Sequence, residues 1–254
     1  MVTALFTTTP MQNQSGDRLV SKVAGAAIAA LFKSSDKAEA NVRAEPVAKL
    51  LQGSLDGFDF IGKGMQMYNG LRIEVMELYL QAISIDFSAI FTGKVKLRQP
   101  IQATMRTVLT ESDLTTSFNT PFVVEKLQRL KYQGQPLYFQ NTQMTITEDR
   151  ELRLNTQVKV GNANQPIDLD FTANIEVEER RKIKFVNVKY NNVNQESVNL
   201  GQSLIDHVNN LLDLDKFAME NTKLQVDRLR VGKDNITFYG IAKIDQFPSG
   251  IKQK

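Results

Sequence analysis

The stretch IDLDFTANIEV, residues 167–177, alternates apolar and polar side chains along its whole length. Successive side chains of a β-strand point to opposite faces of a sheet, so this segment has one apolar face and one polar face. A strand with one dry and one solvated face is typical of an antiparallel sheet. The alternation therefore predicts a half-buried antiparallel strand whose apolar face carries Leu169 and Phe171.

Other segments follow or interrupt the same alternation. VKLRQPIQATMRTVL, residues 95–109, places Met105 on its apolar face and Lys96 on its polar face. LRIEVMELYLQAISI (residues 71–85) and LQVDRLRV (residues 224–231) change phase midway. A β-bulge would insert one residue and bend the strand, whereas a strand packed on both faces needs no bulge. Both interpretations stay open, and we expect a strongly curved sheet.

An uncharged stretch near the N-terminus, VAGAAIAALF (residues 23–32), indicates a helix. Asp17 offers an N-cap, and a helical wheel separates an apolar stripe rich in alanine from a face that carries Arg18, Lys22 and Lys33. Small side chains allow a helix to pack closely against a sheet. We therefore predict a long N-terminal amphipathic helix packed in the curved sheet.

Three further segments have helical signals. DFSAIFTG (residues 86–93) is a short turn, Thr110 and Asp113 are spaced like a capping box, and residues 196–218 carry apolar side chains at helical spacing. Helices that interrupt runs of strands predict an α+β fold class with further short helices.

Composition limits the kind of protein. The chain has 254 residues, 42% hydrophobic and 23% charged, a balance that suits a soluble globular domain. We expect a disordered tail at residues 1–16, a single domain at residues 17–248 and a C-terminal tail at residues 249–254. The net charge of +3 is too small for a duplex DNA binder by itself, so no nucleic-acid partner is expected.

The uncharged stretch cannot cross a bilayer alone, because ten helical residues span only about half of a ~30 Å hydrocarbon core. No basic n-region precedes it, so we expect no secretory signal. These features predict a cytoplasmic protein.

Catalytic signals are weak. The chain has no cysteine and one histidine, His207, which excludes thiolate ligands, a cysteine nucleophile and His-rich metal sites. Glu178–Glu179 and Asp213/Asp215 are neighbouring carboxylates, but charged clusters at hairpin tips are usually solvated. GKGMQMYNG (residues 62–70) lacks the Gly-Lys-Ser/Thr ending of a phosphate loop. We predict no enzyme activity, no cofactor and no metal.

Much of the chain, residues 19–244, resembles the bacterial LmeA-like phospholipid-binding family. The resemblance rests on four short motifs: Leu-Leu-x-Gly at residues 50–53, Gly-Lys-Val-Lys-Leu-Arg-x-Pro at 93–100, Thr-Glu-x-Asp-Leu at 110–114, and Asp-Leu at 213–214. It implies a tubular lipid-binding fold of the BPI-like type, in which a long helix lies in a highly curved sheet and a cleft between them takes acyl chains. Phospholipid, or another acyl-chain lipid, is the implied partner.

Within that picture, apolar side chains of the helix and strands would line the cleft. They are Leu19, Val23, Ala27, Leu31, Met65, Met67, Met105, Met144, Leu169 and Phe171. Methionine adapts to irregular ligands, although ordinary core packing explains the methionines equally well.

Basic clusters would dock on an anionic membrane, at Lys94, Lys96, Arg98, Arg180, Arg181, Lys182 and Lys184. A solvated surface explains such clusters too. We expect a non-catalytic lipid-binding protein that associates peripherally with membranes. The alternative is a protein-interaction scaffold, or an accessory subunit of a lipid-modifying enzyme, with a filled core and no lipid.

Overall fold

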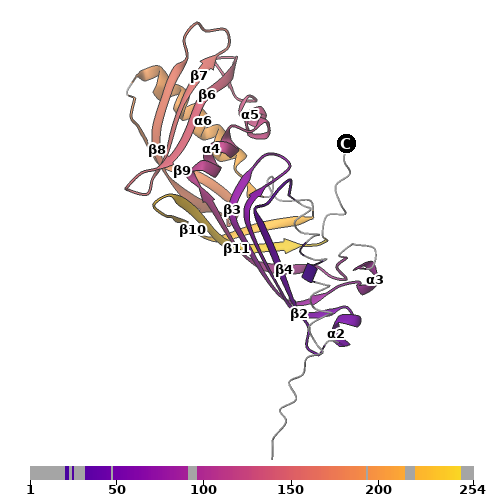
Figure 1. Ribbon diagram of the computed structural model, residues 1–254. Coiled ribbons are helices and arrows are strands. Elements are labelled where there is room, and N and C mark those ends of the chain that lie inside the picture. Colours follow the sequence, from indigo (N-terminus) through magenta and orange to yellow (C-terminus); the bar gives the residue numbers. More distant parts are fainter. Residues whose placement is uncertain are drawn as a thin grey trace, which may run out of the picture.

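The computed structural model describes residues 21–22, 25, 32–46, 48–90, 96–192, 194–214 and 221–246. Its strands form two antiparallel sheets that lie end to end along an elongated molecule (Figure 1).

The first sheet has six strands in the spatial order β1-β2-β3-β4-β11-β10. Their bounds are β1 Lys37–Arg43, β2 Ser54–Gln66, β3 Arg72–Ser84, β4 Ile101–Thr110, β11 Asn235–Ile244 and β10 Thr222–Val231. β1 to β4 follow one another in the chain, whereas β10 and β11 come from its far end. The pairing of β11 with β4, Ile244 opposite Ile101, therefore joins the last strand of the described chain to the last of the four N-terminal strands.

The second sheet has five strands in the order β5-β6-β7-β8-β9. Their bounds are β5 Lys131–Tyr132, β6 Gln135–Ile146, β7 Leu152–Val160, β8 Ile167–Glu178 and β9 Lys182–Tyr190. Each strand is connected to the next along the chain by a short loop, as expected for an antiparallel meander.

The described helices are short except one. Their bounds are α2 Ala48–Leu51, α3 Phe87–Ile90, α4 Glu111–Phe118, α5 Pro121–Leu127 and α6 Gln195–Leu211. The predicted capping box of α4 is confirmed: Thr110 Oγ1 accepts a hydrogen bond from Asp113 N, and Asp113 Oδ2 accepts one from Thr110 N. α6 lies against the second sheet, where the Asn209 side chain hydrogen-bonds both the N–H and the carbonyl of Phe185 in β9.

Two hydrophobic cores correspond to the two sheets. The first includes Phe60, Leu80 and Ala103 on one face of the six-stranded sheet. The second lies between the five-stranded sheet and the helices, and includes Leu137 of β6 and Leu204 of α6. Each core lies against its own sheet, but two strands of the first sheet, β10 and β11, contribute side chains to both cores.

β10 and β11 supply side chains to both cores. In β11, Ala242 belongs to the first core and Ile236 to the second. In β10, Leu224 packs against the first core and Leu229 against the second. The register between the two strands shifts between Val226 and Arg228, so the bulge interpretation of this phase change is confirmed. The extra residue turns the later side chains of β10 toward the second core.

The phase change near the end of β3, between Leu80 and Ile83, has another origin. β3 keeps one constant register with β2 from end to end, so no residue is inserted. Ala82 instead has a left-handed φ of 51°. Ile83 and Ile85, which follow it, are both buried in the first core.

The predicted fold class is wrong. The molecule is mostly antiparallel sheet in two separate sheets, and no long N-terminal helix is evident in the part of the chain that the structure describes. Most of the predicted helix, residues 17–33, lies outside the described residues, as do the predicted tails. The division into two sheets was not foreseen, because periodicity tells which side of a strand is buried but not which distant strands pair with it.

Candidate functional site

The residues predicted to line a lipid cleft divide between the two cores. Met65 and Met105 are buried in the first core, and Met67 packs against it together with Met76. Met144, Leu169 and Phe171 belong to the second core. Leu19, Val23, Ala27 and Leu31 lie outside the described residues. The predicted set is therefore not one cluster.

Four methionines belong to the first core or pack against it, and local backbone geometry makes room for one of them, Met65. A Cβ on Gly62 would lie 2.2 Å from the Sδ of Met65, so the missing side chain at position 62 leaves space for the Met65 thioether. Met65 is fully buried, and its strand partner is Ile73. The first core thus combines branched aliphatic side chains with unbranched, adaptable ones.

The second core is closed by helices. Leu127 of α5 and Leu200, Leu204 and Ile205 of α6 are buried in it, and Leu114 of α4 packs against it. Among the described residues, none from α4, α5 or α6 belongs to the first core. The first sheet has a different neighbour: the described helical residues Ser21 and Gly25 lie beside β1, where Ser21 Oγ accepts a hydrogen bond from Val42 N at 2.9 Å.

The basic segment at residues 178–184 forms a hairpin tip between β8 and β9, as expected. Glu179 and Arg180 occupy the turn with φ values of 51° and 59°. Two successive left-handed residues are typical of a type I′ turn, which usually contains Asn or Gly. This turn is held by its surroundings: Arg180 O accepts a hydrogen bond from Val226 N at 2.6 Å, and Arg181 O accepts one from Leu214 N at 2.8 Å.

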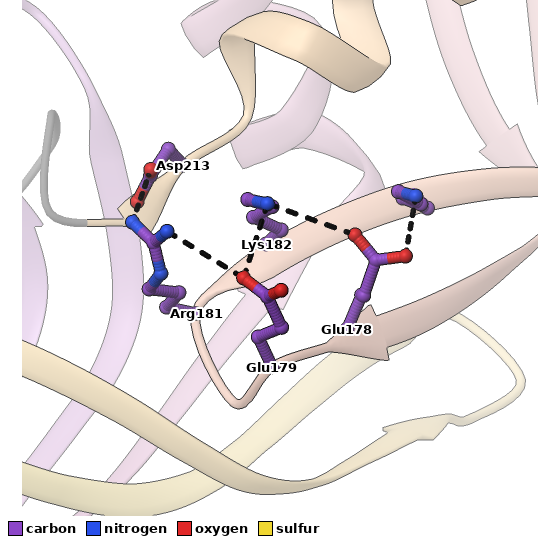
Figure 2. Close-up of polar contacts among 6 residues, drawn as sticks. Glu178, Glu179, Arg181, Lys182 and Asp213 are labelled. Carbon is purple, nitrogen blue, oxygen red and sulfur yellow. Dashed lines mark hydrogen bonds and ion pairs between the residues drawn. The ribbon is translucent and has the colours of Figure 1, made fainter.

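The charged side chains of the tip are paired with one another and with neighbours (Figure 2). Lys182 Nζ lies 3.1 Å from Glu179, and Lys184 Nζ lies 2.5 Å from Glu178. Arg181 bridges Glu179 and Asp213, at 3.5 and 2.7 Å. The Lys182 hydrogen bond is the main reason that the pKa of Glu179 is lowered.

Arg180 extends the same network to the first sheet, where it forms an ion pair with Asp227. Asp227 is the extra residue of the β10 bulge. The tip therefore joins the second sheet to the first. Three of the neighbouring carboxylates considered above for catalysis, Glu178, Glu179 and Asp213, form ion pairs with Lys or Arg side chains. Asp215 lies outside the described residues.

The second predicted basic cluster lies at the far end of the first sheet. Lys96 and Arg98 are exposed, and Arg98 Nη1 donates to Gln52 O at 3.0 Å. Lys94 lies outside the described residues. Gln52 directly follows α2, whose Leu51 is 68% exposed. Figure 1 places α2 and α3 together at this end of the molecule.

His207 has a structural contact. Its Nε2 lies 3.2 Å from the carbonyl oxygen of Lys126, which connects α6 to the end of α5. Among the described residues, no group of three or more His, Cys, Asp or Glu side chains could hold a metal ion. None of the described helices is long and apolar enough to span a membrane.

One site was missed by the sequence analysis. A polar depression of about 380 Å³ lies on the outer face of the second sheet and is lined by Asn141, Asn155, Gln157, Asp168, Asp170, Asn191 and Asn192. The alternation in β8 correctly assigned Asp168 and Asp170 to the polar face. Strand pairing brings side chains of β6, β7 and the segment after β9 close to these two residues. The sequence has no local signal for this pairing.

Comparison with known proteins gave one match. The family model of LmeA-like phospholipid-binding proteins matches residues 13–241. Searches of curated proteins and of solved structures found no match. Since the family model covers most of the chain, this protein belongs to the LmeA-like phospholipid-binding family.

Proposed function

We propose that this family member binds the acyl chains of a phospholipid against the apolar face of the first sheet and meets membranes with the end that carries α2 and α3. Membership of a phospholipid-binding family supports the ligand class. The observation that carries the choice of site is the grouping of Met65, Met67, Met76 and Met105 at the first core.

The contrast between the two cores supports this choice. The second core is packed against α4, α5 and α6, and inserting a chain there would require these helices to separate. The first core is formed mainly by strand residues, and its methionines can change rotamer to follow a flexible chain. Lipid sites are mostly apolar and need few polar contacts, which suits this composition.

Incorporation of photo-methionine tests the site directly. The purified protein is illuminated with phospholipid vesicles, and cross-linked peptides are mapped by mass spectrometry. We expect lipid adducts at Met65, Met67, Met76 or Met105 and none at Met144, which serves as the matched control in the second core. Adducts at Met144 alone would assign the chains to the second core and contradict the proposed site.

Native mass spectrometry tests the function itself. Protein purified without detergent should carry a phospholipid or another two-chain lipid, because an apolar cleft is costly to leave empty. A bare polypeptide mass, together with no uptake of a fluorescent lipid, would favour a scaffold or accessory subunit with a filled core.

The membrane-facing end is proposed from exposed groups that lie close together. Leu51 is apolar and exposed, Arg98 donates to the carbonyl of the adjacent Gln52, and the exposed Lys96 precedes Arg98 by two residues. An Arg or Lys near an anionic surface contributes about 1 kcal/mol. Replacing Leu51, Lys96 and Arg98 with Ser should weaken binding to anionic vesicles, whereas Tyr138→Ser, at an exposed tyrosine of the second sheet, should not. Equal binding by both variants would contradict this orientation.

A further inference from the structure

The polar depression on the second sheet has a lining of one chemical kind. All seven side chains are amides or carboxylates, and they come from β6, β7, β8 and the segment after β9. Its volume of about 380 Å³ falls within the range of ligand pockets, about 300–1,000 Å³. The depression faces away from both apolar cores, because Asp168 and Asp170 alternate with the buried Leu169 and Phe171 along β8.

The lining side chains hold one another in place. Asn141 Nδ2 donates to Gln157 Oε1 at 3.1 Å, and Gln157 Nε2 donates to Asp168 Oδ1 at 3.1 Å. Asn191 Nδ2 donates to Asp170 Oδ1 at 2.9 Å. A side-chain amide has two N–H donors and two acceptor lone pairs, so each of these bonds leaves further capacity at the same group. The site is therefore ordered before a ligand arrives, which reduces the entropic cost of binding.

A backbone irregularity brings Asn141 into this arrangement. The register between β6 and β7 shifts between Gln140 and Gln143, and Asn141 has a left-handed φ of 53°. Thr142, which follows it, turns inward and hydrogen-bonds the buried Thr156 at 2.7 Å. Bulges commonly re-aim a side chain, and this one keeps Asn141 on the outer face beside Gln157.

The charges of the site limit the class of ligand. Asp170 is neutralised by Arg153, whose Nε lies 2.8 Å from Asp170 Oδ1, and no Lys or Arg side chain lines the depression. A phosphate or carboxylate ligand would meet Asp168 without a compensating cation. Two carboxylates are few for a bare metal ion, in keeping with the absence of a metal-binding group among the described residues.

We propose that this depression binds a neutral polyhydroxylated ring, as found in saccharides and in the head groups of neutral glycolipids. Each hydroxyl both donates and accepts a hydrogen bond, and side-chain amides beside a carboxylate offer both functions at neighbouring positions. Neighbouring hydroxyls of one ring would bridge Gln157 and Asp168, while Asn141 and Asn155 flank them. This depression is separate from the lipid site proposed above, which uses the first core.

Nuclear magnetic resonance tests this site with defined probes, because side-chain NH₂ groups give their own signals. ¹⁵N-labelled protein is titrated with mannose, glucose, galactose and myo-inositol. At least one probe should cause saturable shifts at the NH₂ groups of Asn141, Asn155 or Gln157, while sodium phosphate and calcium chloride should not. Gln157→Ala and Asp168→Ala should each weaken binding about tenfold, and Thr145→Ala, on the same face outside the depression, should not change it.

A second arm distinguishes the source of the ring. Binding of the protein to phosphatidylcholine vesicles is compared with and without a galactosyl diacylglycerol. Vesicle binding that requires the galactolipid would identify the ligand as a glycolipid head group. Binding of the free sugar without binding of these vesicles would identify it as a soluble saccharide. Absence of saturable shifts with all four rings and with galactolipid vesicles would overturn the proposal. Shifts caused by calcium chloride alone, or equal losses in all three variants, would overturn it too. Bound phospholipid is measured separately, so this outcome leaves the proposed lipid function untouched.

Discussion

At the residue scale, Gly201 shows how packing can reverse a helix preference. Gly201 lies within α6, where replacement by Ala normally stabilises a helix by up to about 1 kcal/mol. A Cβ at this position would lie 2.4 Å from Cε1 of Tyr190 and 3.2 Å from its Cζ. The partly buried ring of Tyr190 is rigid and cannot yield in the way a flexible side chain can, so the glycine is required by the ring beside it.

We therefore expect Gly201→Ala to lower the free energy of unfolding by about 1–3 kcal/mol, as for other overpacked sites. Chemical denaturation measures the change. Asn199→Ala, on an exposed position of the same helix, serves as the control and should change stability by less than about 0.5 kcal/mol. A stabilised Gly201→Ala protein would mean that Tyr190 does not pack on α6 in this way.

Glu151 and Lys189 form a pair whose effect depends on pH. Lys189 Nζ lies 2.6 Å from Glu151 Oε1. This hydrogen bond, followed by one from Thr172, lowers the pKa of Glu151 from its ordinary value of 4.5. A carboxylate with a lowered pKa stabilises the fold above its unfolded pKa, and this contribution is lost as pH falls through the folded value.

We expect the stability of the parent to fall more steeply below about pH 4.5 than that of Glu151→Gln. Lys189→Met should also make the loss of stability at acidic pH less steep, because it removes the side chain that lowers the pKa of Glu151. Thermal unfolding followed from neutral to acidic pH measures the difference. Parallel curves for the parent and both variants would show that the pair contributes nothing.

At the element scale, the bulge of β10 determines which core its later side chains reach. Deleting Asp227 would remove the extra residue and turn Leu229 and Val231 away from the second core. We expect a loss of about 2 kcal/mol or more, given the apolar burial of two such side chains. Asp227→Ala keeps the residue count and removes only an exposed ion pair with Arg180, so it should cost less than about 1 kcal/mol. Equal losses in denaturation experiments would contradict the role of the bulge.

Several elements could be predicted because their signals are local. The capping box of α4 needs only Thr110 and Asp113, and the alternation of β8 by itself identifies its buried face. The division into two sheets could not be predicted, since it depends on the pairing of β11 with β4 across more than a hundred residues of chain. The sequence likewise identified the methionines as apolar residues that face a core. It could not show that Met65 and Met144 belong to different cores, because that too depends on strand pairing.

At the scale of the whole molecule, β11 makes the two cores depend on each other. Gly240 lies between its two sets of core residues, and a Cβ there would lie 1.9 Å from Gln225 O and 2.9 Å from Val226 Cα. Both are backbone atoms of β10, so no side-chain movement can relieve the contact. The close approach of the two strands at this point therefore requires glycine.

We expect Gly240→Ala to destabilise the protein by about 3 kcal/mol or more and to reduce hydrogen-exchange protection in both sheets together. Gly134→Ala is the control: no atom lies within 4 Å of its added Cβ, so only the strain of its φ of 77°, about 1 kcal/mol, should appear. Loss of protection in one sheet alone would show that the two cores unfold independently.

The docking of the β8–β9 tip has a consequence for how copies of the protein behave toward one another. β10 is the last strand of its sheet, and an open strand edge is a template on which another chain can add by backbone pairing. The hydrogen bond from Val226 N to Arg180 O occupies that edge at its centre. The extra residue at Asp227 also breaks the regular spacing of donors there. The hairpin thus covers the centre of this edge and hinders its pairing with a strand of another copy.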